Sequence, residues 1–293
     1  MLHNSQKDFI GRHIGPSDND QQKMLKDLNF KSLDDLINST VPEKIQFKGE
    51  LNIGDSNSEY EALRKLKAIS KKNQIYSNFI GMGYYGTYTP YVILRNILEN
   101  PGWYTSYTPY QPEVAQGRLE MLLNFQQMVV DLTGMDIANA SLLDEGTAAA
   151  EAMGLSHRLN KSDSNLVFIS ENCHPQTIDV VQTRAEPMGL KVLVGNEDKV
   201  LDQLKEDVVC GILQYPGTLG DIKDPSEHIS KIHKKNGKAI LACDLLALAK
   251  LKTPGELGAD IAVGSSQRFG IPMGYGGPHA AFFATKDEFK RSM

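Results

Sequence analysis

The sequence contains few cysteines and no long hydrophobic segment. Its three cysteines, Cys173, Cys210 and Cys243, lie far apart without a CxxC pair, which argues against a disulfide framework or a zinc site and favours a reducing compartment. No apolar run approaches the roughly 18 residues that span a bilayer. The first eight residues lack the basic and apolar segments of a secretory signal, and an Arg-rich presequence is also missing. We therefore expect a cytoplasmic protein.

Strong charge of either sign is also missing. The formal net charge is −5 over 293 residues, so the chain has no electrostatic reason to bind nucleic acid or an anionic membrane. Hydrophobic residues make up 41% of the chain, which excludes a disordered or collagen-like protein. The length corresponds to about two domains, or to one large α/β domain with an appendage.

The first 75 residues are predicted to form an N-terminal helical arm. Apolar residues recur at helical intervals between residues 18 and 36, and Pro42 ends this pattern. A second helix is predicted to begin at Ser58, because Ser58 and Glu61 have the spacing of a capping box.

Residues 76–293 are predicted to form a three-layer α/β domain. A long helix is expected from near Pro112 to Gly134, and short apolar runs then alternate with helical segments, as in crossover units around a mostly parallel sheet. The last run, at residues 280–284, reads as a buried strand with no later element to cover it. We therefore expect the isolated chain to associate or to be poorly soluble.

Residues 81–86 (GMGYYG) match the GxGxxG pattern of dinucleotide-binding proteins. That pattern requires a helix directly after the glycines, whereas here the next helix is expected only near Pro90, with Thr89 as its cap. No acidic residue at a strand end follows about 20 residues later. The segment is better interpreted as a substrate-facing wall that presents Tyr84 and Tyr85, or as a structural turn with tyrosines in the core.

Four residues occur in an order typical of pyridoxal-phosphate enzymes. Gly146 and Thr147 begin an Ala-rich helix, where free N–H groups can hold a phosphate, and His174 and Asp244 each follow a predicted strand. In such enzymes these positions supply the phosphate cradle, the group stacked on the ring and the carboxylate paired with the pyridinium nitrogen.

The lysine that would complete such a site is missing. The cofactor is held by a lysine after the next strand, and Gln267 stands there in this sequence. Lys250 and Lys252 are near in sequence but are expected in or just after the helix that follows Asp244, which is the wrong element.

Five motifs extend over essentially the whole chain: FIGRHIGP at 9–16, GMGYYGTYTP at 81–90, NPGWYTSYTPYQPEVAQGRLE at 100–120, LDEGTAAAE at 143–151 and SQRFGIPMGYGG at 266–277. Together they resemble the motifs of the glycine cleavage system P-protein family. The resemblance implies a fold-type-I, aminotransferase-like pyridoxal-phosphate fold in two similar halves, fused or separate, of which only the C-terminal half carries the cofactor lysine. This chain resembles the N-terminal half but is shorter than a complete one, so its C-terminal part is expected to be missing.

The resemblance implies an oxidoreductase of glycine catabolism, glycine dehydrogenase (decarboxylating). Glycine would condense with pyridoxal phosphate on the other half, its carboxylate would leave as CO₂, and the aminomethyl group would pass to the lipoyl arm of H-protein. The implied partners are glycine, H-protein and the C-terminal half or a second P-protein subunit. The isolated chain is expected to be inactive.

On this reading the chain supplies binding residues but no catalytic residue. Tyr84, Tyr85, Gly86 and Thr87 are expected to contribute to the glycine pocket, because a hydroxyl-bearing, Gly-rich loop can orient a carboxylate or an imine. The four residues of the pyridoxal-phosphate pattern are expected to be remnants of a cofactor site, and no metal is expected. Two alternatives stay open: a stand-alone enzyme that uses Lys250 or Lys252, and a non-catalytic interaction half.

Overall fold

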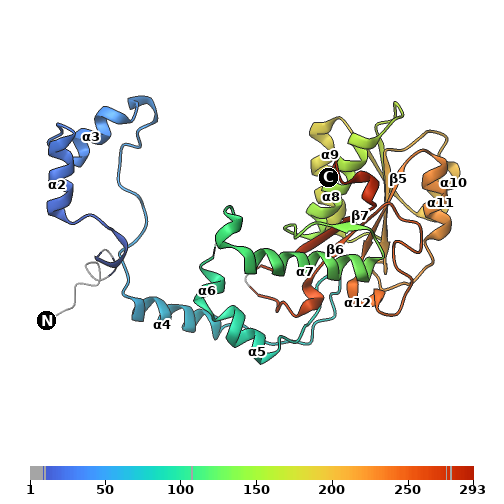
Figure 1. The fold of residues 1–293 in the computed structure, drawn as a ribbon, viewed down its shortest axis with the longest axis horizontal. Helices are drawn as coiled ribbons and strands as arrows, with labels where there is room; N and C mark the ends of the chain where they lie inside the picture. The colour runs from blue at the N-terminus through green and yellow to red at the C-terminus, as the bar shows by residue number, and fades with distance from the viewer. Residues whose placement is uncertain (1–8, 10, 107, 275, 278) are drawn as a thin grey trace. The chain divides into compact units, whose positions relative to one another are not determined.

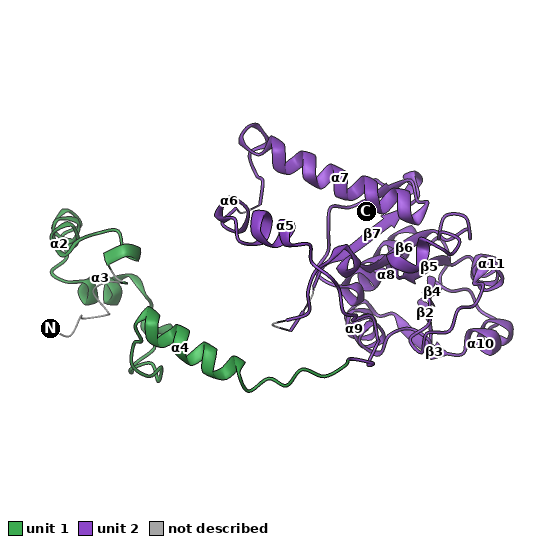
Figure 2. Cartoon of the chain, turned by 90° about the horizontal axis from the view of Figure 1, so that it is seen from below, with its two compact units in different colours: residues 1–77 green, residues 78–293 purple. Residues whose placement is uncertain are grey.

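The computed structural model describes residues 9, 11–106, 108–274, 276–277 and 279–293, and it divides the chain into two compact units, residues 1–77 and 78–293 (Figure 2). Residues 1–8, which are expected to lack a secretory signal, lie outside the described residues. So does one residue in each of three of the motifs above, at positions 10, 107 and 275.

The first unit is helical. The capping box predicted at Ser58 is confirmed, since its hydroxyl accepts from the Glu61 N–H and the Glu61 carboxylate accepts from the Ser58 N–H. Asn29, with a φ of 62°, lies between α2 and α3, because a left-handed residue ends a helix. Its elements include α2 (Asp18–Asp27), α3 (Leu33–Thr40), the 3₁₀ turn η1 (Glu43–Ile45) and α4 (Glu59–Ser70).

The second unit begins with a segment without regular structure that is followed by several helices, and strands alternate with helices from residue 137 on (Figure 1). The predicted long helix is present, and it ends at Gly134, which has a φ of 65°. The α-helices are α5 (Tyr91–Ile93), α6 (Pro101–Tyr104), α7 (Gln116–Thr133), α8 (Glu145–Leu159), α9 (Pro175–Ala185), α10 (Glu197–Gln203), α11 (Ser226–Lys234) and α12 (Leu245–Leu248). Shorter turns are the π-helix η2 (Leu94–Leu98) and the 3₁₀ turns η3 (Pro112–Val114), η4 (Glu186–Met188), η5 (Gln267–Phe269) and η6 (Asp287–Phe289).

A seven-stranded sheet forms the centre of this unit, in the order β1-β7-β6-β5-β4-β2-β3. The five strands from β6 to β3 are parallel, and β7 runs antiparallel to both of its neighbours. The carboxyl ends of the five parallel strands therefore meet at one edge of the sheet. The strands are β1 (Ile137–Ala138), β2 (Leu166–Ser170), β3 (Lys191–Gly195), β4 (Cys210–Tyr215), β5 (Lys238–Cys243), β6 (Ile261–Ser265) and β7 (Ala281–Thr285).

Helices cover both faces of the sheet. One buried apolar cluster joins α8 and α9 to the strands, and a second joins α7, α10, α11 and α12 to the opposite face. Alternate residues of a strand divide between the two clusters, as Phe283 and Phe282 of β7 do. The predicted three-layer α/β architecture is confirmed.

Two local expectations are wrong. The strand at the end of the chain, β7, is not left uncovered, because it pairs with β1 and β6 and all five of its residues are buried. Thr89 does not cap the next helix, since its hydroxyl donates to the Gly270 carbonyl instead. In the part of the chain that the structure describes, no helix is both long and apolar enough to cross a membrane.

Candidate functional site

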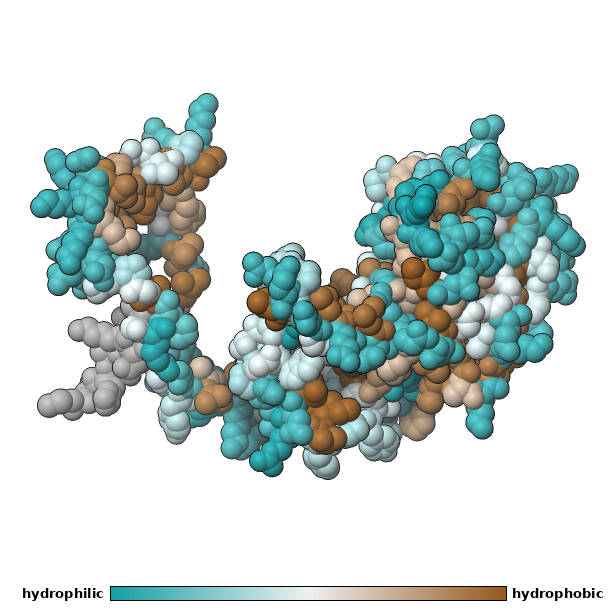
Figure 3. Space-filling model, in the orientation of Figure 1, coloured by the Kyte–Doolittle hydropathy of each residue, from teal (hydrophilic) through white to brown (hydrophobic). Residues whose placement is uncertain are grey.

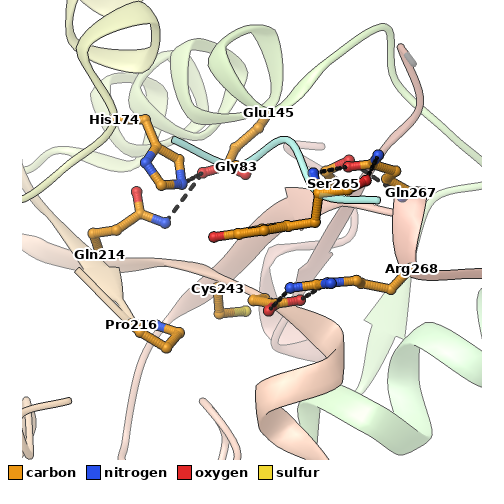
Figure 4. Close-up of a pocket in the computed structure, with 11 residues that line it drawn as sticks. Gly83, Glu145, His174, Gln214, Pro216, Cys243, Ser265, Gln267 and Arg268 are labelled. Carbon is orange, nitrogen blue, oxygen red and sulfur yellow. Dashed lines mark hydrogen bonds and ion pairs between the residues drawn. The ribbon is translucent and has the colours of Figure 1, made fainter. Parts of the chain in front are cut away.

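A small cavity lies at the carboxyl edge of the parallel strands, where β2, β4, β5 and β6 end. Its volume is about 20 Å³, roughly the room that one water molecule needs. Sequence-predicted residues from four separate segments meet here (Figure 4). The lining consists of Gly83, Tyr85, Glu145, His174, Gln214, Pro216, Cys243, Asp244, Ser265, Gln267 and Arg268.

Gln267 replaces the expected lysine and is almost fully buried, with 1% exposure. Its Nε2 donates to the Tyr85 carbonyl at 2.5 Å, and its Oε1 accepts from the Tyr85 N–H at 3.2 Å. One side-chain amide thus satisfies both backbone groups of Tyr85. This position offers no amine to a cofactor.

Asp244 is paired with Arg268, a residue that the sequence analysis did not single out. Nε and Nη2 of Arg268 donate to the two carboxylate oxygens of Asp244 at 2.9 and 2.8 Å. The same guanidinium lies over the Tyr85 ring, 3.9 Å from its centroid. Such a two-bond pair leaves the Asp244 carboxylate no need of a pyridinium partner. The only sequence signal for Arg268 was its place next to Gln267.

His174 is buried beside the first turn of α9. Its Nδ1 lies 2.9 Å from the Thr218 hydroxyl, and burial lowers the pKa of His174 to about 4 against the opposing charge of Asp244. The imidazole is therefore neutral near pH 7. Gly83 lies directly against the ring: a Cβ at that position would be 3.0 Å from the His174 Cδ2 atom.

Two carboxylates occupy the beginning of α8, where a phosphate cradle was predicted. The Asp144 side chain caps the helix by accepting from the Thr147 N–H at 2.7 Å. Glu145 is the first helical residue, and its carboxylate accepts from Gln214 Nε2 at 3.2 Å. Burial raises the pKa of Glu145 to about 7, and the charge of Asp244 adds to this shift. The end of this helix, which could bind an anion, is therefore already capped by the chain's own Asp144 side chain.

The remaining predicted residues do not all reach the cavity. Tyr84 and Gly146 line a neighbouring cavity of about 80 Å³. The Thr87 hydroxyl donates to the Ile271 carbonyl at 2.8 Å. Gly86 faces open space, with no atom within 4 Å of the position that a Cβ would occupy. Lys250 and Lys252 are exposed and line neither cavity.

Taken together, the residues present do not fit a covalently held pyridoxal phosphate. The lysine position holds an amide, and the carboxylate for the ring nitrogen is bonded to an arginine. The helix that would bind the phosphate begins with Asp144 and Glu145, and the open volume is far below the roughly 300 Å³ of a usual cofactor pocket. Among the described residues, no group of three or more His, Cys, Asp or Glu side chains could hold a metal ion.

Comparison with known proteins gives one consistent family. The model of the "Glycine cleavage system P-protein" family matches residues 11–293. Glycine dehydrogenase (decarboxylating) of Pelagibacter ubique (strain HTCC1062) is 81% identical over all 293 residues, and that of Stutzerimonas stutzeri (strain A1501) is 58% identical over 285 residues, or 97% of this chain. The chain spans only 30% and 29% of the length of these two relatives.

Solved structures agree with the predicted fold type. A glycine decarboxylase (P-protein) of the glycine cleavage system, in inhibitor-bound form, superposes with a TM-score of 0.85 and 32% identity over 95% of this chain and 64% of its own. A chain of the SepCysS-SepCysE N-terminal domain complex gives a TM-score of 0.52 at 18% identity over 81% of this chain and 62% of its own. This second match bears on the fold alone. The expected aminotransferase-like fold of pyridoxal-phosphate enzymes is confirmed.

Proposed function

Because the chain belongs to the glycine cleavage system P-protein family, we propose that it is the N-terminal part of a glycine decarboxylase whose pyridoxal phosphate is bound by the other part. This proposal depends mainly on the presence of Gln267 in place of a lysine. It stands where this fold needs a lysine, and it is buried and bonded to the Tyr85 backbone rather than free to react.

In the complete enzyme, glycine would lose its carboxylate as CO₂ and pass its aminomethyl group to the lipoyl arm of H-protein. Pyridoxal phosphate supplies the electron sink for this reaction when it is bound. The residues of this chain would bind and orient glycine and exclude water. None of them is assigned a covalent step.

The proposed contact with glycine is the segment Tyr84, Tyr85, Gly86 and Thr87. Burial raises the pKa of Tyr84, and the charges of Asp144 and Glu145 add to this effect. Its hydroxyl thus stays protonated at neutral pH and can donate a hydrogen bond to a carboxylate. The open space at Gly86 lets another molecule approach the backbone closely.

The proposed partners are the lysine-bearing half or subunit, H-protein and glycine, in the cytoplasm. Exposed apolar side chains on α5 and η2 support a protein partner; Figure 3 shows a hydrophobic patch over α5. Their exposed fractions reach 87% at Tyr91 and 63% at Val92, and a contiguous apolar surface is typical of a protein interface. The three cysteines are free and buried, as a reducing compartment allows.

The test combines this chain with the lysine-bearing part, H-protein and pyridoxal phosphate and measures glycine-dependent exchange of labelled CO₂. We expect exchange only when both parts are present. Equal exchange without this chain would contradict the proposal and favour a non-catalytic half. Borohydride reduction followed by peptide mapping tests the stand-alone alternative, which predicts a labelled Lys250 or Lys252.

A further inference from the structure

We propose that Gln267 and Arg268 are positioning residues that hold the tyrosine loop, residues 81–90, in the space that a cofactor occupies in other members of this fold. On this inference, residues that line the cavity now support the tyrosine loop.

The tyrosine loop contributes little to its own conformation. None of residues 81–90 belongs to a helix or strand, and Gly81, Met82 and Gly83 have φ values of 67°, 53° and 83°. A left-handed conformation is unfavourable for a side chain such as that of Met82. Within the described residues, one backbone hydrogen bond joins two residues of the loop, from the Tyr84 N–H to the Gly81 carbonyl. The loop therefore depends on contacts outside itself.

Gln267 supplies the central contact. A side-chain amide can accept from a backbone N–H with its oxygen and donate to the carbonyl of the same residue with its nitrogen, and Gln267 does both at Tyr85. A lysine could only donate and an ionised glutamate could only accept. The residue type at this position therefore suits the two hydrogen bonds to the Tyr85 backbone.

Arg268 supplies the second contact, at the Tyr85 side chain. Its guanidinium lies 3.9 Å from the centroid of the ring and is itself fixed by two hydrogen bonds to Asp244. A cation held over an aromatic face stabilises that ring position, and more so where water is excluded. Burial also raises the pKa of Tyr85, with the charge of Asp244 adding to the shift, so the ring stays neutral beside its carboxylate neighbour.

Further contacts continue along the whole loop. Gln176 Nε2 donates to the Met82 carbonyl at 2.7 Å, which stabilises the backbone at its least favourable residue. The hydroxyls of Thr87 and Thr89 donate to the carbonyls of Ile271 and Gly270. Both ends of the loop are therefore bonded to neighbouring segments, while Tyr84 lines the neighbouring cavity and Gly86 faces open space.

Hydrogen–deuterium exchange of peptides covering residues 81–90, in the complete enzyme, tests this inference without any turnover measurement. In Gln267→Met, which keeps the volume but loses both hydrogen bonds, we expect these peptides to exchange at least about fivefold faster than in the wild type. The exposed Gln203 of α10 provides the control Gln203→Met, which should leave their exchange unchanged. Unchanged exchange in Gln267→Met would overturn the inference.

A second variant distinguishes the loss of these hydrogen bonds from a general folding defect. Gln267→Glu can both donate and accept when the new carboxyl group is protonated but only accept when it is ionised. Exchange relative to the wild type at the same pH should therefore be near normal in mild acid and faster at pH 8. A ratio that does not change with pH would contradict the amide pairing.

The inference rests on the proposed function only in its effect on glycine turnover. If Gln267→Met accelerates exchange and lowers kcat together, the loop is both held by Gln267 and used in the reaction. If exchange accelerates while kcat and KM stay constant, the inference stands and the glycine-pocket proposal fails. Normal exchange with lowered kcat would instead overturn the inference and leave the proposed function intact.

Discussion

The Glu145 carboxylate lies 3.9 Å from Nε2 of His174, and burial shifts both groups toward their neutral forms. It raises the pKa of Glu145 to about 7 and lowers the pKa of His174 to about 4. The pair therefore does not form a stable ion pair near neutral pH. An acid and a base this close, both held neutral by their surroundings, make the site sensitive to pH.

Glu145→Gln should stabilise the protein at alkaline pH. Because the folded pKa of Glu145 lies above the usual 4.5, its contribution to stability is full below pH 4.5 and is lost as the pH rises through about 7. The amide keeps a neutral partner for Gln214. We expect urea unfolding to show a gain of about 1–3 kcal/mol at pH 8 and little change at pH 4.5. An equal effect at both pH values would show that Glu145 does not titrate in this way.

The pairing of Asp244 and Arg268 predicts strong coupling between the two positions. Both side chains are about one-fifth exposed, so Asp244→Asn should leave a poorly solvated guanidinium and cost about 1–3 kcal/mol of unfolding free energy. Arg268→Met should cost a similar amount. The double variant should lose much less than the sum, because neither charge is then left alone. Additive losses would mean that the pair contributes no net interaction.

Restoring the lysine should not restore the cofactor. Gln267→Lys places an amine after β6, but the wild-type cavity has a volume of only about 20 Å³, and the Asp144 carboxylate already caps the start of α8, where a phosphate would bind. After incubation with pyridoxal phosphate and borohydride reduction, peptide mapping should find no pyridoxyl group at position 267. The lysine-bearing part of the enzyme serves as the positive control. A labelled position 267 would show that the pocket is still able to take the cofactor.

Gly83→Ala should be more harmful than the same change at Gly220. The two glycines have φ values of 83° and 86°, so the conformational cost of a Cβ is nearly equal. At Gly83 the added Cβ would lie 3.0 Å from His174 Cδ2, whereas at Gly220 it meets nothing within 4 Å. We expect an extra loss of about 1–3 kcal/mol at Gly83, measured by thermal unfolding. Equal losses would mean that the loop can move away from His174 at no cost.

Removing one tyrosine hydroxyl should separate binding of glycine from folding. In the complete enzyme, Tyr84→Phe should lower kcat/KM for glycine about tenfold, the effect of one lost hydrogen bond of about 1.4 kcal/mol, without a change in melting temperature. Tyr60→Phe, at an exposed tyrosine of α4, is the matched control. Kinetics equal to the wild type would return Tyr84 to a purely structural role.

The local pattern of the sequence was sufficient for the elements and for part of the site. Alternation of apolar runs and helical segments predicted the layered sheet, and the strand-end positions of His174 and Asp244 predicted that both would lie at its carboxyl edge. Gln267 could be recognised as a replaced lysine because the spacing after a parallel strand is regular. The order of strands and helices, and the position of a residue relative to a strand end, can be read from short segments because each element has its own periodicity of apolar residues.

Only the tertiary structure decided what these residues contact. Gln267 and Tyr85 are 182 positions apart, and no local pattern indicates that an amide of one meets the backbone of the other. The pairing of Asp244 with Arg268 and the cover over β7 likewise depend on strand order, which places β6 between β5 and β7. Local propensity acts over a few residues, whereas contacts between distant segments are selected by the packing of the whole sheet. For that reason the sequence located the pocket, and the folded chain determined what fills it.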